Sequence, residues 1–69
     1  MADRISVTVN GRIVEVYAGM EVQHALTAYD LEVYAACRRG EMVVADEHGF
    51  RVGLTGTLHD GARLYVKAA

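Results

Sequence analysis

Four side chains in this sequence have the chemistry to bind a metal ion or to act as a nucleophile: His24, His48, His59 and the single cysteine, Cys37. Imidazole and thiolate groups are the donors that Zn²⁺ prefers, but structural zinc sites use short paired spacings, and none occurs here. A nucleophilic cysteine needs a histidine partner and a cleft. The spacing therefore favours a solvated His24, two turn histidines and a small buried or half-buried thiol. We predict no catalytic residue, no metal ligand and no cofactor.

Two charged runs raise the question of ion binding. Arg38 and Arg39 are adjacent, as an anion site would require, but two arginines just before Gly40 are more typical of a helix C-terminus, where cations favour the helix dipole. Asp46 and Glu47 lie in a segment that reads as a solvated hairpin tip. We expect neither run to form a site.

Composition limits the class of protein. The chain has 69 residues, of which 52% are hydrophobic and 23% charged, so we expect one globular domain over residues 1–69. A single cysteine excludes an intramolecular disulfide, and residues 1–20 lack a basic segment followed by an apolar run, so we expect a cytoplasmic protein. No apolar run approaches the ~20 residues of a membrane helix, and a net charge of −2 with interspersed signs argues against nucleic-acid binding.

The central element predicted from the pattern is a helix over residues 21–29. Val22, Ala25, Leu26 and Tyr29 recur at i, i+3, i+4 and i+7, which is one apolar helical stripe. The rest of the chain reads mainly as short strands. We therefore predict an α+β fold in which a small sheet wraps around this helix.

Residues 5–17 predict a β-hairpin, because two segments rich in β-branched residues are joined by Asn10-Gly11, the pair best suited to a two-residue I′ turn. This turn pairs Val9 with Arg12, and the register continues to Arg4 opposite Tyr17. One face of the hairpin should then be the core side, with Ile5, Val7, Val9, Val14 and Val16. The other face should carry Arg4, Ser6, Thr8, Ile13, Glu15 and Tyr17.

A second, short helix is predicted over residues 31–39, with Asp30 as its N-cap and Gly40 after its end. Leu31, Tyr34 and Ala35 share one face of this helix. An irregular loop is the alternative for the same segment.

A second hairpin is predicted from two segments, 41–45 and 50–54, with Gly49 available for a left-handed conformation. In its second strand, alternation predicts Phe50, Val52 and Leu54 inside, and Arg51 and Gly53 outside. The turn-rich residues 55–61 lead to a last strand over 62–67. In that strand Leu64 and Val66 should face in, and Arg63, Tyr65 and Lys67 should face out. The order permits the last strand to lie beside the first, in a mixed sheet of four or five strands.

With these elements in order, the chain resembles the β-grasp (ubiquitin-like) superfamily, and within it most nearly the ThiS/MoaD-type sulfur carriers. The resemblance covers nearly the whole chain and rests on three segments: VNGRIVEV at 9–16, GMEVQHAL at 19–26 and LHDGARLYV at 58–66. Each segment is mostly turn chemistry and alternation, so together they indicate a fold more than a function. TGS domains of RNA-associated proteins and plant-type ferredoxins look similar over the same segments.

Two departures from these families bear on function. The sulfur-carrier resemblance implies a C-terminal Gly-Gly whose carboxylate is adenylated and thiolated, whereas this chain has Ala68-Ala69 after Lys67. Each alanine adds a Cβ and restricts φ, so we expect a carrier fold without carrier chemistry. The ferredoxin resemblance implies four cysteine ligands, and one cysteine cannot supply them.

The outer face of the predicted sheet is the candidate site. Ile13, Tyr17 and Tyr65 should lie on it together. The charged rim around them should consist of Arg4, Glu15, Arg63 and Lys67, a composition typical of protein-binding surfaces. Because a sheet wrapped on one helix usually has no deep pocket, we expect no enzyme and no small-molecule substrate. We predict a non-enzymatic protein-binding module whose partner is another protein or a second copy. The alternatives are a ThiS/MoaD-like carrier with an atypical tail and a TGS-like RNA-binding module.

Overall fold

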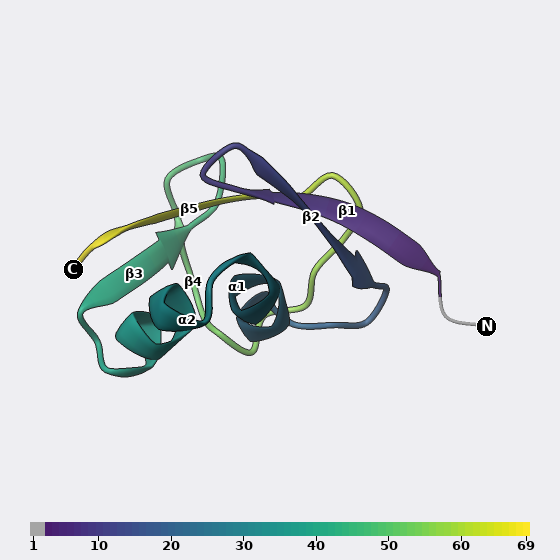
Figure 1. Cartoon of the computed structure of the whole chain (residues 1–69). Coiled ribbons are helices and arrows are strands. Elements are labelled where there is room, and N and C mark those ends of the chain that lie inside the picture. Colours follow the sequence, from purple (N-terminus) through teal and green to yellow (C-terminus); the bar gives the residue numbers. More distant parts are fainter. Residues whose placement is uncertain (1–2) are drawn as a thin grey trace.

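The structure, a computed structural model, describes residues 3–69 and has an α+β fold of five strands and two helices. The strands form one mixed sheet in the order β2-β1-β5-β3-β4, with β1 parallel to β5 and the other pairs antiparallel. Both helices lie on the same side of this sheet (Figure 1). The predicted α+β class, the mixed sheet and the second helix are confirmed. The elements are β1 (Arg4–Val9), β2 (Arg12–Tyr17), α1 (Val22–Tyr29), α2 (Leu31–Arg38), β3 (Met42–Ala45), β4 (Arg51–Val52) and β5 (Arg63–Ala68).

The β1–β2 hairpin has the predicted register at all six residue pairs, which end with Val9 opposite Arg12. Its turn has Asn10 at φ 51° and Gly11 at φ 83°, the left-handed conformations that an I′ turn requires. The Asn10 side chain also ties this turn to β5, because its Oδ1 accepts a hydrogen bond from the backbone N–H of Val66 at 2.8 Å. The hairpin is therefore fixed both by its own turn and by the neighbouring strand.

The core lies between the hairpin and α1, as predicted. Val7 and Val9 are almost completely buried, Val14 and Val16 are buried, and Ile5 is half-buried and packs against them. On α1 the buried residues are Val22, Ala25 and Leu26, with Tyr29 half-buried at the end of the stripe.

Helix α1 begins without a Ser or Thr cap. Instead, the backbone N–H of Glu21 donates a hydrogen bond to Nδ1 of His24 at 2.9 Å, which satisfies a donor at the helix start. His24 is exposed, in agreement with the prediction of a solvated helix position. Neither helix of residues 3–69, at eight residues each, has the length or apolar character needed to span a membrane.

Helix α2 begins where predicted, and the face that it buries is not the one that carries Leu31, Tyr34 and Ala35. The Asp30 side chain accepts a hydrogen bond from the backbone N–H of Glu32 at 2.9 Å, which confirms it as the N-cap. The buried residue is Ala36, and Val33 and Cys37 pack beside it. Of the predicted face, Leu31 is 63% exposed and Tyr34 and Ala35 are only half-buried. Helix α2 is apolar on two faces, and it packs against α1 and β3 with the face that carries Ala36.

The β3–β4 hairpin is shorter than predicted, and the prediction that Phe50 faces the core is wrong. Phe50 is 70% exposed, whereas Val52 and Leu54 are partly buried against the core. Strand β4 contains only two residues, so the alternation of a strand does not extend to Phe50. Phe50 belongs instead to the turn, where its backbone N–H donates to Oδ1 of Asp46 at 3.0 Å. The predicted left-handed conformation of Gly49 is confirmed by its φ of 83°.

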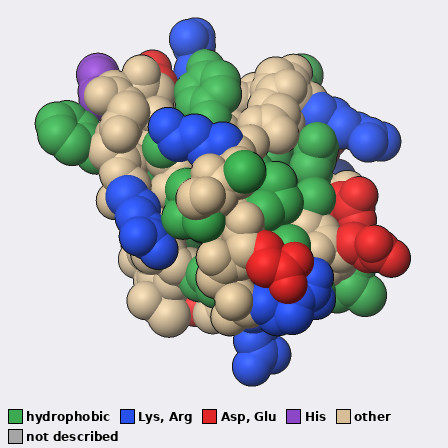
Figure 2. Space-filling model, turned by 90° about the vertical axis from the view of Figure 1, so that its left-hand side faces the viewer, with side chains coloured by type: hydrophobic (Ala, Val, Ile, Leu, Met, Phe, Trp, Pro, Cys, Tyr) green, Lys and Arg blue, Asp and Glu red, His purple; other side chains and the backbone are tan. Residues whose placement is uncertain are grey.

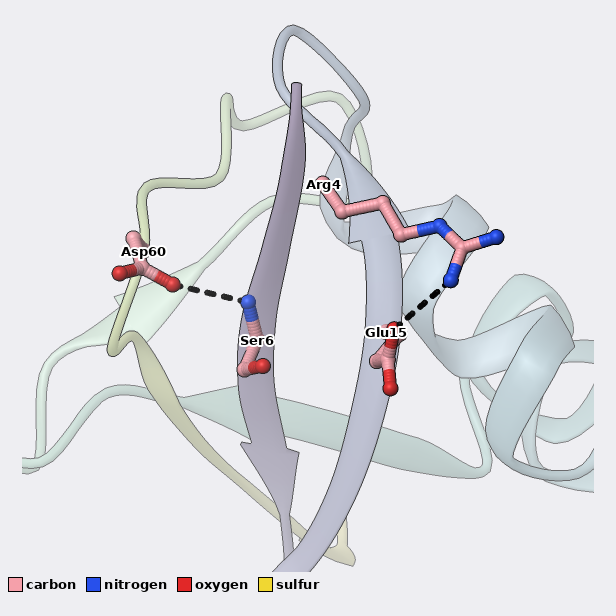
Figure 3. A network of polar contacts seen from close by, with 4 residues as sticks. All are labelled: Arg4, Ser6, Glu15 and Asp60. Atoms are coloured by element: carbon pink, nitrogen blue, oxygen red, sulfur yellow. Dashed lines mark hydrogen bonds and ion pairs between the residues drawn. The ribbon is translucent and has the colours of Figure 1, made fainter. Parts of the chain in front are cut away.

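Strand β5 lies in the middle of the sheet beside β1, and Leu64 and Val66 face the core as predicted. The loop before it is tied to β1, because the backbone N–H of Ser6 donates to Oδ1 of Asp60 at 2.8 Å (Figure 3). The strand continues to Ala68, one residue further than predicted.

The last residues of the chain are paired with the sheet. Ala68 lies opposite Met42 on β3, and the backbone N–H of Ala69 donates to the carbonyl oxygen of Glu41 at 3.1 Å. Ala68 is therefore part of the sheet, and Ala69 is held by a hydrogen bond to the residue before β3.

Candidate partner-binding surface

The outer face of the sheet, opposite the helices, is built by alternate residues of β2, β1 and β5. Thr8 lies opposite Ile13 on one side and opposite Arg63 on the other, so these three side chains form one row across three strands. Ile13 is 71% exposed because neither helix covers this face (Figure 1). The predicted outward direction of Ile13 and Arg63 is thus the observed one.

Tyr65 and Lys67 follow Arg63 on the same face of β5. Tyr65 lies opposite Ala45 of β3 and is 42% exposed, and Lys67 lies opposite Val43 and is exposed. From Arg63 to Tyr65 the strand advances about 7 Å, which places the tyrosine near the row of Ile13. We call Ile13, Arg63, Tyr65 and Lys67 the outer-face cluster.

Tyr17 also faces outward, with an exposure of 44%, but it lies at the other end of the sheet. It is opposite Arg4, four residues before Thr8, whereas Tyr65 is two residues beyond the partner of Thr8. Six residue spacings separate Tyr17 from Tyr65 by about 20 Å along the strands. Relative to the row of Ile13 and Arg63, Tyr65 lies about 7 Å along the strands and Lys67 about 13 Å in the same direction, whereas Tyr17 lies about 13 Å in the opposite direction.

An ion pair lies between Ile13 and Tyr17 on the hairpin. Nη1 of Arg4 is 3.4 Å from Oε2 of Glu15, across the two strands (Figure 3). Both side chains are largely exposed, so this pair contributes little to stability. Its effect on the surface is to place polar groups between the outer-face cluster and Tyr17.

The outer-face cluster has a local positive charge on a chain whose net charge is −2. Within residues 3–69, neither Arg63 nor Lys67 takes part in an ion pair, in contrast to Arg4 and Arg39. Where the end of β5 lies beside β3, hydrophobic side chains are interspersed with Lys and Arg on the molecular surface (Figure 2). An apolar centre with unpaired cations favours a partner whose contact surface is apolar with an acidic rim.

A pocket of about 350 Å³ opens between the β3–β4 turn and the loop before β5. It brings together His48 and His59, two of the three histidines, with Asp46 and Glu47 on the same wall. The Oδ1 atom of Asp46 is already used by the turn, since it accepts hydrogen bonds from the backbone N–H groups of His48 and Phe50. Among residues 3–69, no three His, Cys, Asp or Glu side chains are arranged to hold a metal ion.

Cys37 is half-buried between α2 and the sheet, and desolvation by burial raises the pKa of its thiol. A raised pKa leaves less thiolate at neutral pH, which opposes nucleophilic reactivity. The hollow beside it is lined by residues of β3 and of the segment 51–54, and no histidine lines it. The geometry does not form a cysteine–histidine pair.

The sequence pattern did not predict the exposure of two apolar residues: it placed Phe50 in the core, and it did not indicate which face of α2, and hence whether Leu31, is buried. The turn chemistry offered a signal for Phe50: Asp46 can bond the backbone of its own turn, which lengthens the turn and shortens the strand that follows. For Leu31 no local signal existed, because the choice between the two faces of α2 is made by tertiary packing. No family model matches this chain, and comparison with curated proteins gives no significant match.

Proposed function

We propose that this chain is a β-grasp domain that binds another protein through the outer-face cluster and catalyses no reaction. The β-grasp assignment is supported by the strand order β2-β1-β5-β3-β4, with a parallel central pair and both helices on one side. Its first and last long strands are neighbours, which matches what the resemblance implies for this fold.

The observation that carries the binding proposal is the exposure of Ile13 and Tyr65 on the uncovered face, at 71% and 42%. When a partner buries large apolar side chains that were exposed to water, the free energy of the complex falls. Tyrosine is common among residues that dominate binding energy. Arg63 and Lys67 beside them supply charge for orientation and specificity.

The test compares protein capture from a lysate of the source cells by three versions of the chain. The wild type and Tyr17→Ser should retain the same partner, because Tyr17 lies outside the cluster. The double variant Ile13→Ser/Tyr65→Ser should lose it, with affinity reduced at least about tenfold if the two residues are binding hot spots. Equal capture by all three versions would contradict the proposal. A circular dichroism spectrum of each variant checks that the fold is intact.

The sulfur-carrier alternative makes a different prediction. Carrier chemistry needs a flexible segment that enters an adenylating enzyme, whereas Ala68 is paired with Met42 of β3 and Ala69 is hydrogen-bonded to Glu41. We therefore expect no mass change when the chain is incubated with ATP and an adenylating enzyme of the sulfur-carrier type. An AMP adduct, or a thiocarboxylate after addition of a sulfur donor, would favour the carrier function instead.

RNA binding is the other alternative, and its test is the dependence of affinity on salt. The chain has only seven Lys and Arg, and Arg4 and Arg39 are paired with glutamates. A TGS-like RNA-binding module would show affinity that falls steeply as salt rises, because cations released from phosphates drive the binding. We expect no such binding. The proposed location is the cytoplasm, for which the support is the single free cysteine.

A further inference from the structure

The sheet has two edges, and only one of them is a long strand. At one edge lies β4, which has two residues, and at the other lies β2, which has six (Figure 1). All residues of β2 pair with β1 in an unbroken register, so no bulge bends the strand, and the sequence contains no proline that would interrupt it. A straight edge strand of this kind presents a row of unpaired backbone groups for pairing with another chain.

The outward backbone groups of β2 belong to Ile13, Glu15 and Tyr17. In an antiparallel ladder, residue pairs that exchange hydrogen bonds alternate with pairs that do not. Thr8 lies opposite Ile13, but its N–H donates to the carbonyl oxygen of Ala62 at 2.9 Å, on the side away from β2. The Thr8–Ile13 pair is therefore one without hydrogen bonds, and the same alternation applies to Glu15 and Tyr17. Their N–H and carbonyl groups point away from β1.

Most of these outward groups are free to bind a partner. Within residues 3–69, the carbonyl oxygen of Tyr17 accepts a hydrogen bond from the N–H of Met20 at 3.1 Å, whereas the three outward N–H groups and the carbonyls of Ile13 and Glu15 make no hydrogen bond. Donors and acceptors that recur every second residue along an extended chain match another extended backbone. The edge of β2 is therefore suited to a further strand.

The side chains along this edge favour a second copy of the chain as the source of that strand. On the outer face, Ile13 is 71% exposed and Tyr17 is 44% exposed, with Glu15 between them. We propose that two copies pair antiparallel through their β2 edges, around a two-fold axis at Glu15. Ile13 then lies opposite Tyr17 of the second copy, and the same contact forms twice by symmetry.

Both the backbone and the side chains select this register. The two Glu15 residues at the axis exchange both of their hydrogen bonds, and the N–H of each Tyr17 donates to the carbonyl of Ile13 in the other copy. A shift by one residue would place outward groups opposite inward ones. A shift by two would leave one outward residue without an outward partner, and would place Glu15 opposite an apolar side chain. The centred register instead pairs each exposed apolar residue with another.

The expected dimer is weak and reversible. The Glu15 side chains lie opposite each other across the axis, which opposes association. Nη1 of Arg4 lies 3.4 Å from Oε2 of Glu15 in each copy, so a cation accompanies each carboxylate (Figure 3). A strand of six residues buries less than the ~800 Å² per partner of a typical stable interface, so we expect dissociation constants in the micromolar to millimolar range.

Two substitutions at one position test the pairing, with sedimentation equilibrium from about ten micromolar to about one millimolar protein as the measurement. Glu15→Pro removes an N–H that the β1–β2 ladder does not use, and its ring obstructs the edge, so this variant should fold and stay monomeric throughout the range. Glu15→Thr is the matched control: it keeps the N–H and removes the repelling charge, so its dissociation constant should fall about threefold. A circular dichroism spectrum checks the fold of each variant.

Further variants separate the dimer from the proposed partner binding. Tyr17→Ser should raise the dissociation constant of the dimer about tenfold and leave partner capture intact. Tyr65→Ser, on β5, should leave the dimer unchanged and weaken partner capture. Ile13 belongs to both surfaces and is therefore not varied here.

The register has its own readout, which does not depend on any variant. In a mixture of isotope-labelled and unlabelled wild-type chains, nuclear Overhauser contacts between copies should join Ile13 to Tyr17. A wild-type chain that is monomeric throughout the concentration range would overturn the proposal. So would a folded Glu15→Pro variant that still dimerises, or contacts between copies that do not include Ile13 and Tyr17.

Discussion

The β1–β2 hairpin and the segment from α2 to β4 solve the problem of burying apolar side chains in different ways. Each six-residue strand of the hairpin places alternate residues in the core, so Val7 and Val9 are almost completely buried. From α2 to β4 the elements have eight, four and two residues, and Leu31 and Phe50 stay 63% and 70% exposed. Alternation along the six-residue strands of the hairpin divides the apolar side chains between the core and the outer face, where Ile13 is 71% exposed. The short elements from α2 to β4 leave Leu31 and Phe50 exposed because no such alternation extends to them.

The largest effect expected from this comparison is a contrast between two large apolar residues. Leu26→Ala removes a completely buried side chain beneath the hairpin and should lower the free energy of unfolding by about 2–5 kcal/mol. Phe50→Ala removes a larger side chain that is 70% exposed, and should change the free energy of unfolding by less than about 0.5 kcal/mol. Urea denaturation of both variants measures the contrast. A loss for Phe50→Ala as large as that for Leu26→Ala would place Phe50 in the core and overturn the comparison.

A smaller effect on stability is expected at two glycines: Gly11 in the turn of the first hairpin, and Gly53 just after the second hairpin. Gly11 has φ 83° in the I′ turn, so Gly11→Ala should cost about 1–2 kcal/mol although a Cβ there would meet no atom within 4 Å. Gly53 has neither a left-handed φ nor a neighbour within 4 Å, and Gly53→Ala should be within about 0.5 kcal/mol of the wild type. Thermal or urea denaturation is the measurement. Equal losses for the two variants would mean that backbone conformation does not distinguish the two sites.

The smallest expected effect concerns pH and the turn between α2 and β3. The hydrogen bond from Arg39, followed by its charge, lowers the pKa of Glu41. A carboxyl group whose pKa is lowered by folding stabilises the fold, and this stabilisation is complete when the pH is above the ordinary pKa of glutamate. The stabilisation is lost as the pH falls through the lowered pKa of the folded state. The wild type should therefore lose slightly more stability on acidification than Arg39→Gln. Arg51→Gln is the control and should follow the wild type, because Arg51 is exposed and forms no ion pair with any of residues 3–69.

The sequence predicted the structure of the β1–β2 hairpin more accurately than that of the segment from α2 to β4. The hairpin was predicted to the residue, because the Asn10-Gly11 turn fixes the register and strict alternation then fixes both faces. Helix α2 was predicted with its cap, but the pattern did not predict which face is buried, since Leu31 and Ala36 lie on opposite apolar sides and only tertiary packing selects between them. Local periodicity carries no information about that choice.

For the candidate site, the sequence predicted which side of the sheet each residue faces more accurately than it predicted the distances between the residues. Each of its five residues faces outward, because direction depends only on alternation within a strand. The distance between residues of β5 and residues of the hairpin depends on how β5 is aligned with β1, and no local sequence pattern predicts that alignment. That alignment places Tyr65 about 7 Å along the strands from the row of Ile13 and about 20 Å from Tyr17.

Site-specific photocrosslinking tests the central claim, that the outer-face cluster binds a protein, most directly. Tyr65 and Tyr17 are replaced in turn by p-benzoylphenylalanine, which preserves an aromatic side chain at two sites of nearly equal exposure. After irradiation in lysate of the source cells, the account predicts a covalent adduct with one discrete protein from position 65, and much less of it from position 17. Crosslinking to nucleic acid, or equal protein adducts from both positions, would contradict the claim.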